Sequence, residues 1–191
     1  MVELFRQLFG QYVNWKILAH FLANPTTGFH IKQLARLLNV SPASVSSAVK
    51  SFEEEGVLSK EEKGLAHIYM LNSDNSVVAP LKKAYGIAFV LSSKPKEKFL
   101  EIDPNIISLA LFGSYADGSF DEKSDVDFLI VTQTKKEAFG GAMKKLEDEL
   151  QKEVNISVFR LSEWRNMAKK GDAFYKRVIE NHILLHGSGL K

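Results

Sequence analysis

The chain has 191 residues, of which 45% are hydrophobic and 25% charged, and it contains no cysteine. This length allows one large domain or two small ones, and the missing cysteines exclude disulfides and thiolate metal sites. The net charge of +2 is too small to indicate a nucleic-acid partner by itself. No apolar run reaches the length of a membrane span, and residues 1–16 lack the pattern of a secretory signal, so a cytoplasmic protein without membrane contact is expected.

The first third of the sequence predicts three helices and a hairpin. Apolar residues recur at helical spacing in NWKILAHFLANP (residues 14–25) and in HIKQLARLLNV (residues 30–40). In the next stretch Ser41 suits an N-cap, Pro42 the first helical position and Gly56 the position after the C-cap. The residues KEEKG then separate two short runs that are expected to pair as a hairpin.

This order of elements resembles a winged helix-turn-helix domain over roughly residues 10–72, carried by HIKQLARLLNVSPASVSSAVKSFEEEGVLSKE. The resemblance implies that residues 41–55 form a DNA-recognition helix and residues 60–70 a wing. Side chains expected to reach DNA from that helix are Ser44, Ser46, Ser47 and Lys50. The acids at 53–55, 61 and 62 argue against strong DNA affinity. The alternative is a packing or dimerisation module, in which case a homodimer is expected.

A different pattern follows a predicted connecting segment at residues 78–97. Residues 105–112, 127–131 and 153–159 are short apolar runs typical of strands, and an amphipathic helix is predicted between the last two. Strands separated by helices indicate an α/β layer with at least partly parallel pairing. The sequence therefore divides into a first domain at 1–77, the connection at 78–97 and a second domain at 98–191.

The second domain carries a polar motif at the ends of two of its strands. Gly113 and Ser114 follow the first strand, where glycine permits close approach to a ligand and a helix start attracts phosphate. Asp125 and Asp127 begin the second strand and point to one face because strand side chains alternate. Two carboxylates on one face repel each other unless a cation lies between them, and oxygen ligands of this kind suit Mg²⁺ or Mn²⁺.

This motif resembles the nucleotidyltransferase superfamily that includes DNA polymerase β, and most closely its minimal branch, over residues 98–191. The resemblance implies an α+β protein of two domains, mainly helical at the N-terminus, with a small mixed sheet at the C-terminus. It also implies that Gly113 and Ser114 hold a nucleoside triphosphate, that Asp125 and Asp127 are catalytic metal ligands, and that a nucleoside monophosphate passes to an acceptor. The acceptor, whether protein, nucleic acid or small molecule, is left open.

Two positions depart from the superfamily's pattern. A third carboxylate is usual on a later strand, and the matching position here is Asn155, which has no charge and cannot act as a base. Glu153 lies two residues earlier on the same strand face and is a candidate substitute. Asp117 stands where the minimal branch often has arginine, so it adds negative charge beside the phosphates.

Two functions therefore remain open from the sequence. One is a metal-dependent nucleotidyltransferase coupled to a DNA-binding winged helix. The other is a weak or inactive relative, either a nucleotide-sensing transcriptional regulator or an antitoxin-type protein that binds a partner. His182 and His186 have the spacing of a helical metal site, but the apolar residues between them favour a short strand.

Overall fold

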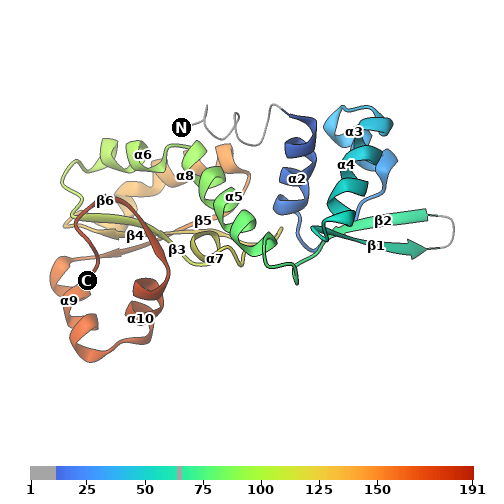
Figure 1. Cartoon of the computed structure of the whole chain (residues 1–191). Helices are drawn as coiled ribbons and strands as arrows, with labels where there is room; N and C mark the ends of the chain where they lie inside the picture. The colour runs from blue at the N-terminus through green and yellow to red at the C-terminus, as the bar shows by residue number, and fades with distance from the viewer. Residues whose placement is uncertain (1–11, 64–65) are drawn as a thin grey trace. The chain divides into compact units, whose positions relative to one another are not determined.

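The computed structural model describes residues 12–63 and 66–191 (Figure 1). The chain forms two compact units, Met1–Ala88 and Phe89–Lys191. Two of the segments interpreted above lie outside the described residues, namely positions 1–11 and positions 64 and 65 in the middle of the expected wing. No helix among the described residues is long and apolar enough to cross a membrane.

The N-terminal unit consists of helices followed by a hairpin, as predicted. Its elements are α2 (Val13–Ala23), α3 (Ile31–Leu38), α4 (Pro42–Glu54), β1 (Leu58–Lys63) and β2 (Ala66–Leu71), with β1 and β2 antiparallel. The caps of α4 are confirmed: Ser41 Oγ accepts a hydrogen bond from the Ser44 amide, and Gly56 follows the helix with a φ of 71°. This arrangement is consistent with a winged helix.

The core of this unit lies between its helices and the hairpin. A short bridge adds a third strand segment, because Phe29 and Tyr69 exchange two backbone hydrogen bonds of 2.9 Å. Apolar side chains from α2, α3, α4 and both strands are buried in the core, among them Ile17, Phe21, Leu22, Leu34, Val45, Val49, Leu58 and Leu71.

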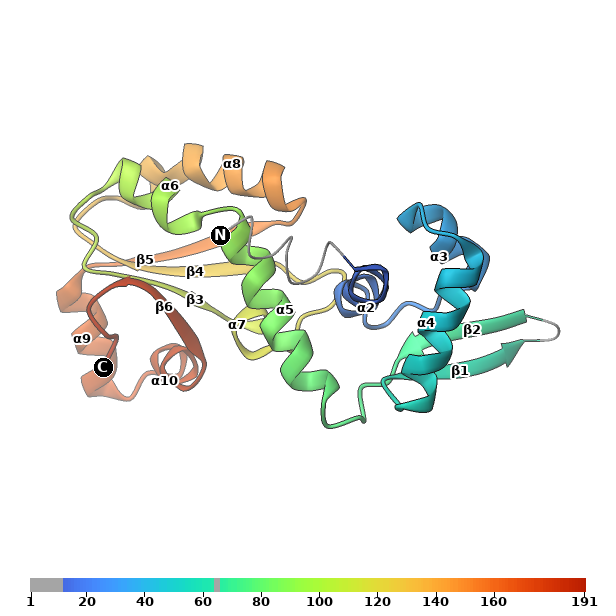
Figure 2. The ribbon, with the colours of Figure 1, turned by 45° about the horizontal axis from the view of Figure 1, so that its top comes forward.

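The C-terminal unit is built on a four-stranded mixed sheet (Figure 2). Its strands are β3 (Ser108–Phe112), β4 (Val126–Val131), β5 (Val154–Phe159) and β6 (His182–Gly187), in the order β5-β4-β3-β6. β4 and β5 are parallel, whereas β3 is antiparallel to both β4 and β6. The mixed sheet confirms the predicted fold class.

Helices cover both faces of this sheet (Figures 1 and 2). On one face lie α6 (Pro95–Ile102), the 3₁₀ turn η1 (Lys136–Phe139) and α8 (Gly140–Leu150), where Phe99 packs edge-on against Phe128 and Phe139. On the other face lie α9 (Leu161–Lys170) and α10 (Ala173–Glu180), whose Trp164 and Val178 pack with Phe112 and Leu129 of the sheet. A single turn, α7 (Ser114–Asp117), follows β3, and α5 (Val78–Ser92) precedes α6.

Two element boundaries differ from the sequence prediction for local reasons. The first strand begins at Ser108 rather than at residue 105, because the Asp103 carboxylate accepts a hydrogen bond of 2.8 Å from the Asn105 amide and holds a turn there. The predicted amphipathic helix begins at Gly140 after the η1 turn. Two adjacent glycines start this helix, and glycine lowers helix propensity.

Candidate functional site

Four polar or aromatic residues, one from each strand, lie in register at one end of the sheet. Asp127 of β4 is in register with Asn155 of β5 and with Phe112 of β3, and Phe112 is in register with His182 of β6. Residues in register point to the same face of a sheet. That face is the one covered by α9 and α10, since Phe112 and Leu129 belong to the cluster that includes Trp164 and Val178.

Gly113 lies directly against Asp127. Its backbone has φ 72° and ψ −156°, a conformation nearly confined to glycine. A Cβ atom added at Gly113 would lie 2.7 Å from Asp127 Oδ2. The structure thus brings the Gly-Ser turn, which we define as Gly113 and Ser114, into contact with the predicted metal ligand.

A hydrogen-bonded loop delivers Asp125 to the start of β4. The Asp121 carboxylate accepts from the Lys123 amide at 2.9 Å and from Ser124 Oγ at 3.0 Å. These hydrogen bonds hold the pKa of Asp121 below its ordinary value. The Val126 amide donates to the Glu153 carbonyl at 2.9 Å, which ties the end of the loop to β5. Asp125 is therefore held between an ordered turn and a paired strand.

In the pair Asp125 and Asp127, which we call the carboxylate pair, the surroundings disfavour the charge of Asp127. Burial raises the pKa of Asp127, and the nearby Asp125 carboxylate raises it further. A hydrogen bond from Asn155 and the positive charge of Arg177 act in the opposite direction but do not cancel the increase. A site with this imbalance has an electrostatic reason to bind a cation.

Asn155 contacts both members of the carboxylate pair, and Glu153 lies just before β5, where its carbonyl accepts from the Val126 amide. Asn155 Nδ2 donates to Asp125 Oδ2 at 3.3 Å and also lowers the pKa of Asp127 by hydrogen bonding. Among the described residues, no group of three or more His, Cys, Asp or Glu side chains is placed to hold a metal ion. The donor set at the sheet end fits one hard divalent cation held by two carboxylates, with other ligands from phosphate or water.

Asp117 has a structural partner next to the Gly-Ser turn. Its Oδ1 accepts a hydrogen bond of 2.8 Å from the Ser119 amide, just after α7. Within α7 the Ala116 and Asp117 amides both donate to the Gly113 carbonyl, at 3.0 and 3.1 Å. The acid at position 117 thus stabilises the turn that shapes the site. Ser114, the first residue of α7, is half-buried.

Arg177 is a residue of this site that we did not predict from the sequence. It lies on α10 with its Cζ atom 5.8 Å from the centroid of the Phe174 ring, and its charge acts on Asp127. The sequence holds no spacing signal for it, because α10 reaches the site through long-range packing, in which Phe174 contacts Phe112 and Val178 joins the same buried cluster. Arg160 and Arg165 lie elsewhere, lining two separate cavities of about 290 and 320 Å³.

The two histidines of β6 do not form a metal site. His182 is in register with Phe112, whereas His186 is in register with Leu109, and a bulge separates the two pairs. The two imidazoles therefore lie on opposite faces of the sheet. His182 Nδ1 is 3.0 Å from the Val178 carbonyl, which it reaches as a donor.

The four residues predicted to reach DNA share α4 but differ in exposure. Ser47 and Lys50 are exposed, and Ser46 is half-buried. The Ser44 hydroxyl lies 2.8 Å from the Ser41 hydroxyl at the helix start. In the adjoining hairpin, Lys60 is paired with Glu53 and Glu62 at 3.5 and 3.6 Å.

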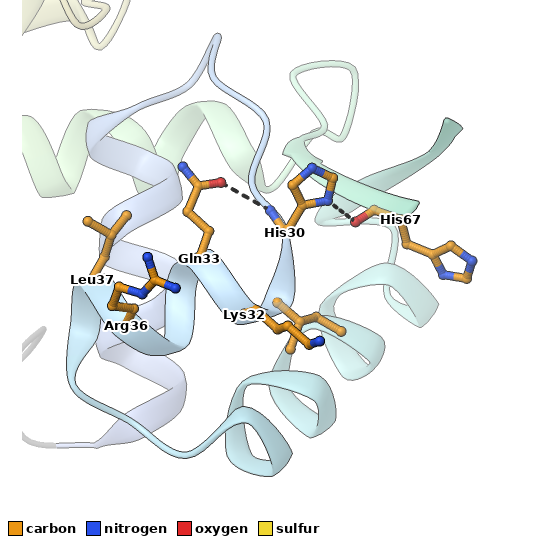
Figure 3. Close-up of a pocket in the computed structure, with 7 residues that line it drawn as sticks. His30, Lys32, Gln33, Arg36, Leu37 and His67 are labelled. Atoms are coloured by element: carbon orange, nitrogen blue, oxygen red, sulfur yellow. Dashed lines mark hydrogen bonds between the residues drawn. The ribbon is translucent and has the colours of Figure 1, made fainter. Parts of the chain in front are cut away.

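A hollow of about 710 Å³ lies on α3 and the start of β2 (Figure 3). We call it the α3 hollow; it is lined by His30, Ile31, Lys32, Gln33, Arg36, Leu37 and His67. His30 Nδ1 donates to the His67 carbonyl at 2.9 Å, which fixes the imidazole against β2. Leu37 is 57% exposed, and the cationic side chains Lys32 and Arg36 are exposed beside it. None of the four predicted DNA-contacting residues lines this hollow.

Comparison with known proteins identifies the second unit. Residues 92–186 match the family described as nucleotidyltransferase domain. No curated protein matches the chain. A solved structure described as "Crystal structure of the toxin-antitoxin with AMP-PNP" is 21% identical and aligns over 50% of this chain and 73% of its own, with a TM-score of 0.39.

Proposed function

Because residues 92–186 form a nucleotidyltransferase domain, we propose that the chain binds a nucleoside triphosphate and transfers its nucleoside monophosphate to an acceptor hydroxyl. In this reaction the acceptor oxygen bonds to the α-phosphorus, the bond from that phosphorus to the leaving oxygen breaks, and pyrophosphate departs. The contact between Gly113 and Asp127 carries the proposal. It joins a turn suited to phosphate and a carboxylate suited to a cation at one sheet end.

Each part of the site has a role in this proposal. Gly113 and Ser114 receive the phosphates, because the missing Cβ leaves room for a ligand beside the backbone. Asp125 and Asp127 hold Mg²⁺ or Mn²⁺, which when bound stabilises negative charge that develops on the phosphate. Asp117 and the Asp121 loop keep these groups in place.

Asn155 favours a second function for the same site. An amide can orient Asp125 but cannot take a proton from an acceptor hydroxyl. A domain with this residue is suited to bind nucleotide and to turn it over slowly. The second candidate is therefore a nucleotide-sensing regulator, or a protein that holds a partner, in which the bound nucleotide is a signal rather than a substrate.

A nucleotide assay separates the two functions. The full chain is incubated with ATP, GTP, CTP or UTP labelled at the γ-phosphate, with Mg²⁺ or Mn²⁺, alone and with protein, nucleic-acid or small-molecule fractions as acceptors. Pyrophosphate release that disappears in Asp125→Ala/Asp127→Ala, but persists in the exposed control Asp148→Ala, supports transfer. Nucleotide binding without release under every condition would exclude transfer and support the regulator.

For the N-terminal unit we propose binding to duplex DNA through the exposed face of α4. Lys50 is exposed there and can pair with a phosphate, and Ser47 can donate to one. The pairing of Lys60 with Glu53 and Glu62 removes one cation from this surface. We therefore expect weak affinity with few phosphate contacts.

A titration of random duplex against salt tests this proposal. Each phosphate contact contributes roughly 0.9 to the slope of log K against log salt. Lys50→Ala should lower that slope by about one unit, whereas the exposed Lys145→Ala on α8 should leave it unchanged. The variant Lys32→Ala/Arg36→Ala shows whether the α3 hollow also contacts DNA. Absence of any binding at low salt would favour the interaction module instead.

A further inference from the structure

Arg177 lies on the sheet face to which the carboxylate pair points. Phe174, one turn before it on α10, packs edge-on against Phe112 at 5.5 Å between ring centroids. Phe112 is in register with Asp127. Because α10 is anchored next to Asp127 in this way, its neighbouring turn carries Arg177 to the rim of the site. The effect of the Arg177 charge on Asp127 agrees with this placement.

An aromatic ring supports the Arg177 guanidinium, and no described carboxylate forms an ion pair with it. Its Cζ atom lies 5.8 Å from the Phe174 centroid, a distance at which a cation is attracted to an aromatic ring. Within residues 12–63 and 66–191 no Asp or Glu forms an ion pair with it. The side chain is exposed, so its donors face solvent. An arginine that is supported by a ring and forms no ion pair with a described carboxylate is suited to bind the anionic group of a ligand.

The negative charges in the site give a reason for a cationic side chain to contact the phosphates of the nucleotide. A triphosphate carries several negative charges, and here it enters a site that already contains Asp125 and Asp127. One divalent cation offsets the carboxylates but leaves the phosphates largely uncompensated. Arg177 is a cationic side chain on the helix that Phe174 anchors next to Asp127. A guanidinium can bind phosphate through two parallel hydrogen bonds, which also orients the group.

We propose that Arg177 binds a phosphate group of the nucleotide, so that α10 forms one wall of the nucleotide site. This inference rests on the proposed binding of nucleotide at the sheet end. Phe174 is then a positioning residue, because its ring holds the guanidinium against the site and its contact with Phe112 anchors the helix.

Calorimetric titration of the full chain with adenosine, AMP, ADP and ATP in the presence of Mg²⁺ tests this inference. Arg177→Ala should weaken ATP binding by about 10- to 100-fold, the range for a hydrogen bond to a charged group. Arg177→Lys should recover only part of the loss, because an ammonium lacks the two-pronged geometry. Adenosine binding should be unaffected, and the phosphate at which the loss first appears identifies the contact.

The controls separate this inference from the proposed function. Arg165→Ala removes an arginine of α9 that lines a different cavity, and it should bind ATP as wild type does. If wild type binds ATP and Arg177→Ala binds it equally well, the inference is wrong and the proposed function stands. If wild type binds none of ATP, GTP, CTP and UTP with Mg²⁺ or Mn²⁺, both are wrong. An equal loss for adenosine and ATP would assign Arg177 a structural role and also overturn the inference.

Discussion

Replacing Gly113 by alanine tests the geometry of the site most directly. The backbone at this position has φ 72° and ψ −156°. A non-glycine residue in this region costs about 1–3 kcal/mol. The added Cβ would also lie 2.7 Å from Asp127 Oδ2, so the carboxylate must rotate away from its place beside Asn155. We therefore expect a loss of stability of about 1–3 kcal/mol and a loss of cation-dependent nucleotide binding.

The unfolding of the C-terminal unit can be followed by its own tryptophan. The chain has two tryptophans, and Trp15→Phe leaves Trp164, which is buried and donates to the Leu190 carbonyl at 2.9 Å. In this background, denaturant titration of Gly113→Ala reports the free energy of unfolding of this unit. Each kcal/mol corresponds to a shift in Tm of roughly 4–8 °C for a domain of about this size.

Gly141→Ala is the matched control. A Cβ at Gly141 of α8 meets no atom within 4 Å, and alanine favours a helix over glycine by about 0.5–1 kcal/mol. This control should therefore be slightly more stable than wild type. If Gly113→Ala unfolds at the same denaturant concentration as wild type and still binds Mg²⁺ with ATP, the strain and the contact with Asp127 do not operate as described.

Three further changes test the charges of this unit. Asp127→Asn should raise stability at neutral pH, because it removes a half-buried charge that burial and Asp125 disfavour. Mg²⁺ with ATP should no longer raise the Tm of this variant, whereas ligand at ten times its Kd should stabilise wild type by about 1.4 kcal/mol. Asn155→Asp should raise pyrophosphate release by about 10²- to 10⁴-fold if a base is what the site lacks, and an unchanged rate would refute that explanation. Burial raises the pKa of Asp103, but hydrogen bonds from Thr132, Thr134 and the Asn105 amide outweigh it, so the pKa lies below its ordinary value. The stabilisation from ionised Asp103 is thus fully present above the ordinary pKa of an aspartate and is lost as the pH falls through the lowered pKa of Asp103. In Asp103→Asn the free energy of unfolding should therefore depend less steeply on pH in this acidic range.

Local chemistry allowed much of this fold to be predicted. Ser41, Pro42 and Gly56 mark the ends of α4 because capping depends on a few neighbouring residues. Alternation along β4 places Asp127 on one face, and the register with Asn155 agrees with the position aligned from the sequence. Such features need no knowledge of distant residues.

Long-range packing accounts for what could not be predicted. Arg177 follows Asp127 in the chain after η1, α8, β5 and α9, and it reaches the site through the packing of α10, in which Phe174 meets Phe112. The opposite faces of His182 and His186 depend on a bulge in the pairing of β6 with β3, which the three apolar residues between them do not reveal. The sequence does not reveal the backbone conformation of Gly113 either, although a glycine can adopt it.

The order of contacts along the chain also has a kinetic consequence. Gly113 follows β3 directly, and the carboxylate pair lies at the start of β4, the next strand in sequence, whereas β6 pairs with β3 only after a long stretch of intervening chain. The bond from Ser108 Oγ to the Ser188 carbonyl, at 2.7 Å, joins residues 80 positions apart. Closing such a loop is slow, and segments of this kind often open as one cooperative unit. Transient opening of α9, α10 and β6 would carry Arg177 away while the paired strands β3, β4 and β5 keep both aspartates in place. Amide hydrogen exchange should therefore find α10 and β6 less protected than β4, and added nucleotide should slow exchange most strongly in α10.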